Sequence, residues 1–191
     1  MHRSMLSRTG RLAGLLAVLA APVAQAAPAQ PGTDQAMWNA VSAGLAVGLL
    51  GVTGSQTLSY GDGKGQMQLF KTLGAGVLAV ELLKHGVRET RPDGTGTDSF
   101  PSGQTAFAFA AATFFDIRYG SDHPAAVPVM YGLAGLTGVA RVVARRHHLQ
   151  DVIAGGAIGA LGAAAFTSPY MRDVNVYPTR DGLGMRYTRM F

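Results

Sequence analysis

The stretch VPVMYGLAGLTGVARVVARRHHLQDVIAGGAIGALGAAAF, residues 127–166, decides the fold. Its apolar residues recur at helical spacing over Val127–Ala144 and again over Leu149–Phe166. Only a short basic turn separates the two segments, so the two helices are expected to run antiparallel. Gly155 and Gly159 place small residues four apart on the second helix, which lets a neighbouring backbone approach closely. The stretch therefore predicts tightly packed antiparallel helices.

Three further helices precede this stretch. Apolar spacing predicts them over Met37–Val52, residues 66–87 and Gly103–Arg118. The segment Gly51–Gly65 and the other connections are rich in Gly, Asp, Ser and Pro, as turns are. Together with the first two, these helices predict an all-α fold, an antiparallel bundle of about five helices over residues 35–170.

The tail has a different pattern. Alternating residues flank Arg180-Asp181-Gly182, which predicts a short C-terminal β-hairpin within residues 171–191. No strand-like alternation occurs before it, so the hairpin is expected to close an otherwise helical chain.

Residues 1–26 have the features of a signal peptide. Three arginines precede an apolar run, Leu12–Ala21, and Ala24-Gln25-Ala26 fits a small-x-small cleavage site. A retained first membrane helix is the other interpretation, although the run is short for a span. Either one predicts that the chain lies on the periplasmic side of the bacterial inner membrane or in the periplasm.

Charge and cysteine content exclude some classes of function. Lys+Arg 16 against Asp+Glu 11 gives +5, and without the acid-free residues 1–26 the balance is 13 − 11 = +2. The remaining cations do not cluster, which argues against a nucleic-acid partner. The absence of cysteine excludes a disulfide framework. Charged residues interrupt helices that could nearly span a bilayer, so both membrane contact and a soluble bundle stay open.

Three short motifs carry the chemistry. In an antiparallel bundle of this connectivity, all three fall at the same end. They are Lys84-x6-Arg91-Pro92, Pro101-Ser102-Gly103 and Arg141-x5-His147-x3-Asp151.

The cations in these motifs suit a phosphate group. Arg91 and Arg141 can each direct a planar guanidinium at phosphate oxygens, and Lys84 supplies a more mobile point charge. Pro92 favours an extended Arg91, which ends the helix there and turns the guanidinium inward. The motifs therefore predict a site for a phosphate monoester or diphosphate.

The helix starts complete the expected site. Ser102 is expected to cap the following helix, which leaves the N–H groups of Gly103 and Gln104 for an anion. His147 and Asp151 lie four apart, so Asp151 is expected to accept the proton of one ring nitrogen and leave the other as a nucleophile. A surface ion pair also fits this spacing, as does part of a metal site. A metal is not expected because no second His or Asp recurs at ligand spacing.

These residues resemble the signatures of the type-2 phosphatidic acid phosphatase superfamily, which includes lipid phosphate phosphatases, vanadium haloperoxidases and class A acid phosphatases. The signatures are Lys-x6-Arg-Pro, Pro-Ser-Gly-His and Ser-Arg-x5-His-x3-Asp, and the resemblance covers roughly residues 66–166, with Ala140 in place of the serine. It implies a helical bundle in which His147 forms a phosphohistidine oriented by Asp151, with no metal or other cofactor. The residues that it implies hold the phosphate are Lys84, Arg91, Ser102, Gly103 and Arg141.

Gln104 departs from the family pattern. It occupies the position of a histidine that protonates the leaving oxygen, and general acid assistance is worth about 10²–10⁴-fold. The leaving group can need little help, as when a diphosphate releases phosphate. Alternatively His148 or His85 donates the proton, or the protein binds phosphorylated ligands without turnover. His123 is excluded because it lies about a helix length away.

The sequence therefore predicts a phosphatase whose substrate is a phosphorylated lipid, an isoprenyl diphosphate or a small phosphoester. The alternative is a non-catalytic or weakly active protein that binds phosphate or phospholipid. Haloperoxidase chemistry is disfavoured because the chain is short and lacks the acid–base histidine.

Overall fold

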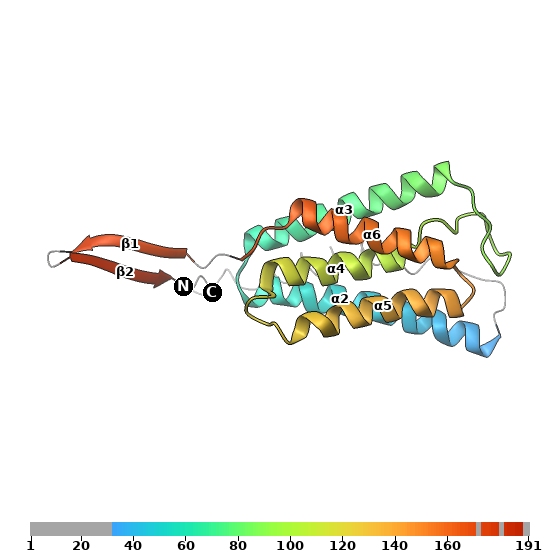
Figure 1. Cartoon of the computed structure of the whole chain (residues 1–191), viewed down its shortest axis with the longest axis horizontal. Coiled ribbons are helices and arrows are strands. Elements are labelled where there is room, and N and C mark those ends of the chain that lie inside the picture. The colour runs from blue at the N-terminus through green and yellow to red at the C-terminus, as the bar shows by residue number, and fades with distance from the viewer. Residues whose placement is uncertain (1–31, 171–172, 180–181, 189–191) are drawn as a thin grey trace, which may run out of the picture.

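The computed structural model describes residues 32–170, 173–179 and 182–188. Within this part of the chain, five helices form an antiparallel bundle (Figure 1). They are α2 (Thr33–Ser59), α3 (Gly63–Gly86), α4 (Gly103–Tyr119), α5 (Ala126–Val143) and α6 (Leu149–Phe166). The predicted all-α bundle of about five helices is confirmed.

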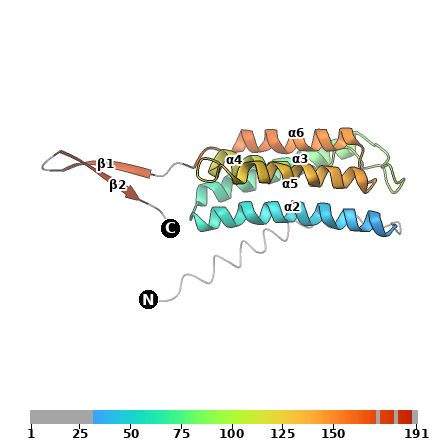
Figure 2. The same cartoon turned by 60° about the horizontal axis from the view of Figure 1, so that its bottom comes forward.

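Helix α4 forms the centre of the bundle. It contacts each of the other four helices, and its Ala108, Ala111 and Phe114 side chains are fully buried. Figure 2 shows α2 along one side of the bundle and α6 along the other. The apolar core therefore surrounds α4, and the ends of the helices are left for polar residues.

Helix α2 is longer than the predicted Met37–Val52, and most of the expected turn over Gly51–Gly65 is helical. The buried Thr53 hydroxyl donates to the carbonyl oxygen of Leu49 at 2.8 Å, within the same helix. This polar side chain therefore has a hydrogen-bond acceptor without leaving the helix. The chain reverses only at residues 60–62, where Gly61 has a φ of 60°. Asp62 then caps α3 by accepting a hydrogen bond from the Gly65 backbone at 2.8 Å.

Helix α6 packs directly on the backbone of α4. A Cβ atom at Gly155 would overlap the carbonyl oxygen of Ser102, and one at Gly159 would overlap that of Ala106. Only glycine allows this approach, so the close contact expected from the small-residue spacing is present.

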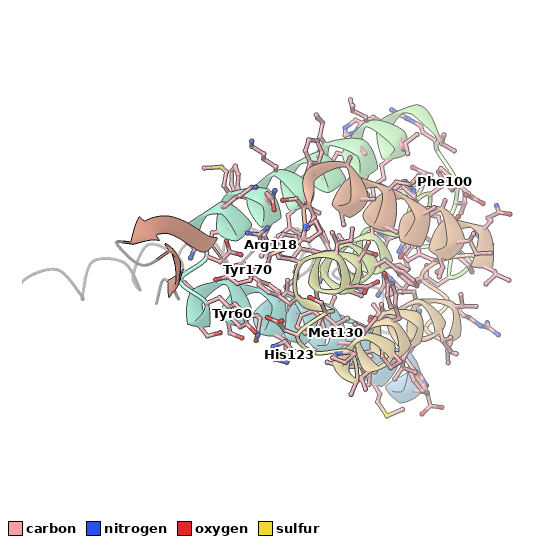
Figure 3. The ribbon with its side chains drawn as sticks, turned by 60° about the vertical axis from the view of Figure 1, so that its left-hand side comes forward. Tyr60, Phe100, Arg118, His123, Met130 and Tyr170 are labelled. Atoms are coloured by element: carbon pink, nitrogen blue, oxygen red, sulfur yellow. The ribbon has the colours of Figure 1, made fainter. Side chains whose placement is uncertain are left out.

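A polar cluster closes the end of the bundle away from the three motifs. The Arg118 guanidinium donates to both carboxylate oxygens of Asp62, at 2.5 and 2.6 Å, and to the carbonyl oxygen of Ser168 at 2.7 Å. Figure 3 shows Arg118 near Tyr60, Tyr170 and His123, with Phe100 of the motif region apart from them. Because the guanidinium and the carboxylate are both buried and paired, this end of the bundle is closed.

The outside of the bundle is strongly apolar. Three helices, Asp34–Ser59, α5 and α6, are long and apolar enough to cross a membrane. Large apolar side chains are exposed on several helices, among them Leu78, Leu82, Val139, Ile153 and Leu161. Such a surface fits association with a membrane.

Beyond the bundle, strands β1 (Asp173–Thr179) and β2 (Gly182–Thr188) pair antiparallel. The turn residues 180–181 and the connecting residues 171–172 lie outside the described residues, so the closing hairpin stays a prediction. The signal peptide expected over residues 1–26 also lies outside them.

Candidate active site

The three motifs meet at one end of the bundle. There α3 and α5 end and α4 and α6 begin, joined by the motif loop (residues 87–102) and by the α5–α6 turn (residues 144–148) (Figure 1). The antiparallel connectivity brings together segments that lie up to about sixty residues apart in the sequence.

His147 is buried and held by the motif loop. Its Nδ1 lies 2.7 Å from the carbonyl oxygen of Ser99, and the side chain is 4% exposed. A carbonyl oxygen only accepts, so Nδ1 carries the proton and the lone pair is on Nε2. The carboxylate of Asp151 lies farther from Nδ1, at 3.6 Å. Ser99 therefore has the hydrogen bond that the sequence analysis expected of Asp151.

Asp151 supports this arrangement through Ser99. Its Oδ2 accepts from the Ser99 hydroxyl at 2.5 Å and from the His148 backbone N–H at 2.8 Å. Its own carbonyl oxygen accepts from the Ser102 backbone at 3.0 Å, which joins the starts of α4 and α6. Asp151 is fully buried. At 3.6 Å its carboxylate acts on the His147 ring electrostatically and through Ser99 rather than by a direct hydrogen bond.

The environment keeps the imidazole neutral. Burial lowers the pKa of His147 to about 4; the positive charges of Arg141, Lys84 and Arg91 act in the same direction, and Asp151 opposes them. At neutral pH the ring therefore offers an unprotonated nitrogen beside three cations.

The predicted cations lie near enough for their charges to act on this ring. Arg91 Nη2 donates to Asp98 Oδ2 at 2.6 Å, and the Lys84 ammonium donates to the carbonyl oxygen of Asp98. Arg141 is 4% exposed, and its Nη1 donates to two neutral groups of α2, Asn39 Oδ1 at 2.9 Å and Ser42 Oγ at 3.3 Å.

Three guanidinium groups at this end each keep one donor unused. The Nε atoms of Arg91, Arg141 and Arg146 are buried and have no hydrogen-bond partner among the residues that the structure describes. Burying a donor without an acceptor costs about 1–3 kcal/mol, more for a charged group. An oxyanion supplies the missing acceptors, so the arrangement suits a phosphate.

The start of α4 differs from the expectation in one respect. Ser102 occupies the N-cap position, but its hydroxyl pairs with Thr105 Oγ1 at 2.9 Å and makes no cap hydrogen bond to the backbone. Gly103 begins the helix as expected. Gln104 Oε1 accepts from the Ser42 hydroxyl at 2.9 Å, so the same serine contacts both Gln104 and Arg141.

The alternative proton donors are directed elsewhere. His85 is exposed on α3, and its Nδ1 bonds the Glu81 carbonyl oxygen at 2.8 Å. His148 Nδ1 lies 3.3 Å from Glu89 Oε1 and 3.5 Å from Asp151 Oδ2. His123 is at the opposite end, 3.0 Å from the Tyr60 hydroxyl (Figure 3).

Several residues of this site were missed by the sequence analysis. Ser99 and Arg146 lie next to motif residues, and Arg146 is 6% exposed with its Nη1 3.1 Å from Asp93 Oδ2. Asn39 and Ser42 come from α2, and their one sequence signal is a pair of polar residues three apart in an apolar helix.

Comparison with known proteins agrees with the motifs. The family profile of the PAP2 superfamily matches residues 65–173, more than half of the chain. A stretch of 99 residues is 41% identical to a lipid A 1-phosphatase from Porphyromonas gingivalis, and it spans 51% of this chain but only 22% of that protein. The crystal structure of a transmembrane PAP2 type phosphatidylglycerolphosphate phosphatase from Bacillus subtilis aligns with a TM-score of 0.44 and 23% identity, over 82% of this chain and 92% of that one. The chain therefore belongs to the PAP2 superfamily, as the three motifs at the end of its bundle indicate.

Proposed function

We propose that this protein is a lipid phosphatase that hydrolyses a phosphate monoester or diphosphate through a phosphohistidine at His147. One observation supports this most: Nδ1 donates to the Ser99 carbonyl oxygen at 2.7 Å, which leaves Nε2 as an unprotonated nucleophile. The low pKa of His147, caused first by burial, keeps that nitrogen unprotonated at neutral pH.

In the proposed reaction, Nε2 attacks phosphorus and the bond from phosphorus to the leaving oxygen breaks, with both electrons going to that oxygen. Lys84, Arg91 and Arg141, with the backbone N–H group of Gly103 at the start of α4, stabilise the charge on the phosphoryl oxygens. Water then attacks the phosphohistidine, which releases phosphate and returns the lone pair to Nε2. Asp151 orients the ring through Ser99 and favours its transient positive charge.

The proposed role of Gln104 is to donate a hydrogen bond rather than a proton. Its Oε1 accepts from Ser42, and an amide nitrogen cannot protonate the leaving oxygen. The leaving group must therefore be stable without a proton, as phosphate is when it leaves a diphosphate. An isoprenyl diphosphate fits this requirement. Lipid A is a candidate on separate grounds, the likeness to a lipid A 1-phosphatase.

The apolar exterior supports a substrate in the membrane. Three helices have the length and composition of membrane spans. If the leader's basic end stays in the cytoplasm, the site faces the periplasm, so we place the reaction on the outer face of the inner membrane.

The test is phosphate release by the purified protein in detergent without added metal, with isoprenyl diphosphate, lipid A and a chromogenic ester as substrates. His147→Ala should lower release at least about 10³-fold, because it removes the nucleophile. Lys84→Ala should lower it about 10²-fold, while Lys71→Ala, which removes an exposed cation elsewhere on α3, should not. Full activity of folded His147→Ala protein would refute the proposed nucleophile.

A non-catalytic phosphate-binding protein is the second candidate, and the neutral amide at Gln104 favours it. Binding of vanadate or orthophosphate, with no release of phosphate from any of these substrates, would support this candidate against the first.

A further inference from the structure

Three side chains meet beside the proposed site, and only one of them has a part in the proposed phosphate transfer. They are Glu89 of the motif loop, His148 at the start of α6 and Asp151 in its first turn. One ligand atom of each lies within 4.8 Å of the others. Two carboxylates and an imidazole are therefore gathered around one point.

The spacing of these atoms is that of ion pairs, and it also suits a metal ion. His148 Nδ1 is 3.3 Å from Glu89 Oε1 and 3.5 Å from Asp151 Oδ2. Two ligands of a tetrahedral zinc ion, each about 2.0–2.1 Å from the metal, lie about 3.3 Å apart. The imidazole and the carboxylates thus have the separation of neighbouring metal ligands.

Asp151 supplies an independent indication of a cation. Its side chain is fully buried, yet its Oδ1 has no hydrogen-bond partner, while Oδ2 already accepts two hydrogen bonds. A buried carboxylate oxygen without a donor is costly and calls for a ligand. A metal ion would satisfy it.

The surroundings resemble those of a metal site as well. Gln150 Nε2 donates to Glu89 Oε1 at 2.7 Å, and the Ser99 hydroxyl donates to Asp151 at 2.5 Å, so both carboxylates are oriented from outside. The side chains of His148 and Glu89 are 41% and 23% exposed, which gives an ion access from solvent.

We propose that Glu89, His148 and Asp151 bind one divalent transition-metal ion of the zinc class, with water in the remaining position. One imidazole nitrogen and two carboxylate oxygens are donors that suit Zn²⁺. The ion is not part of the phosphate transfer. However, Asp151 would then have two roles, as a ligand of the ion and as the carboxylate that supports His147. A bound dication would offset the negative charge that favours the phosphohistidine. Zinc is therefore expected to slow phosphate release, a consequence that rests on the proposed function.

The site is tested by zinc binding without any substrate. Full-length protein free of a histidine tag is stripped with a chelator in detergent and titrated with Zn²⁺ by calorimetry. We expect one zinc per chain, and at least about tenfold weaker binding for His148→Ala and for Glu89→Gln. His85→Ala removes an exposed histidine outside the cluster and should bind zinc as the wild type does. No stoichiometric binding by the wild type, or unchanged binding by both folded cluster variants, would overturn the site.

Two further measurements separate this site from the phosphatase. His147→Ala removes the proposed nucleophile but none of the three ligands, so it should still bind zinc. Zinc should inhibit phosphate release by the wild type. The same zinc concentration should inhibit release by the Glu89→Gln variant less. Zinc binding with uninhibited release would refute the link between the ion and Asp151, whereas zinc binding by a protein that releases no phosphate would refute the proposed phosphatase alone.

Discussion

At the scale of single residues, the proposed substrate class depends on Gln104. Its carbonyl oxygen accepts from Ser42, which also contacts Arg141, so the amide belongs to the network that holds this proposed phosphate-binding cation. The amide oxygen of Gln104 has a hydrogen-bond donor in this network. The surrounding residues therefore fit a glutamine at this position.

Replacing Gln104 by histidine tests this interpretation. Gln104→His restores a proton donor, so hydrolysis of an alkyl phosphate should rise at least about tenfold, whereas hydrolysis of a diphosphate should change little. Gln104→Asn keeps an amide and serves as the control, with no gain on either substrate. Initial rates on the two substrate classes measure the difference, and an equal gain on both would contradict the account of a missing acid.

His147 should also leave a signature in the pH dependence of stability. Its pKa in the folded protein, lowered to about 4 by burial, lies below the unfolded value of about 6.5. Its contribution is therefore complete above pH 6.5 and is lost as the pH falls toward 4, a change of about 3 kcal/mol in the free energy of unfolding.

Urea unfolding of the wild type and of His147→Gln at several pH values measures this contribution, because the other titrating groups are common to both proteins. The difference between their free energies of unfolding should shift by about 3 kcal/mol over this window. A constant difference would show that folding does not shift the pKa of His147.

At the scale of helices, the contact between α4 and α6 positions the site. Asp151 and the N-terminus of α4 are joined by one backbone hydrogen bond, and Gly155 and Gly159 continue the contact along α6. The α6 backbone can therefore hold Asp151 in place only while it stays against α4.

Two alanine substitutions in α6 separate packing from helix propensity. Gly159→Ala would place a methyl group against the carbonyl oxygen of Ala106, whereas the methyl group of Gly162→Ala would lie 3.9 Å from the nearest atom of another helix, Thr72 O. Both gain up to about 1 kcal/mol of helix propensity. Thermal unfolding should show Gly162→Ala at or above the wild-type midpoint and Gly159→Ala several degrees below it. Equal midpoints would mean that α6 does not depend on this contact.

At the scale of the whole molecule, the bundle has a polar end and an apolar circumference. The cations and the His147 ring lie at one end, and large apolar side chains such as Leu161 on α6 and Leu82 on α3 are exposed along the sides. This distribution suits a bundle surrounded by acyl chains, with its site at the membrane surface.

A single charge on that circumference tests the arrangement. Leu161 is 70% exposed, so Leu161→Lys would be harmless in water but should cost about 2.5–3.5 kcal/mol in a bilayer. We expect the wild type and the control Leu161→Ala to remain with membranes in high salt and to be extracted by detergent, and the membrane-bound yield of Leu161→Lys to fall. Extraction of the wild type by salt alone would contradict membrane embedding.

The sequence by itself determined the helical bundle and the residues that meet at its end. Helical periodicity and the alternation of helix direction are local properties, so they placed Lys84, Arg91, Arg141 and His147 together without any knowledge of packing. It also predicted the close contact made by the small residues of α6.

Only the tertiary structure decided which atoms contact one another. Ser99 accepts the imidazole proton, α2 supplies the partners of Arg141, and Glu89 joins His148 and Asp151, because loop conformation brings distant residues within bonding distance. The spacing of residues along the chain does not predict such contacts, because they depend on how the loops fold back over the helix ends.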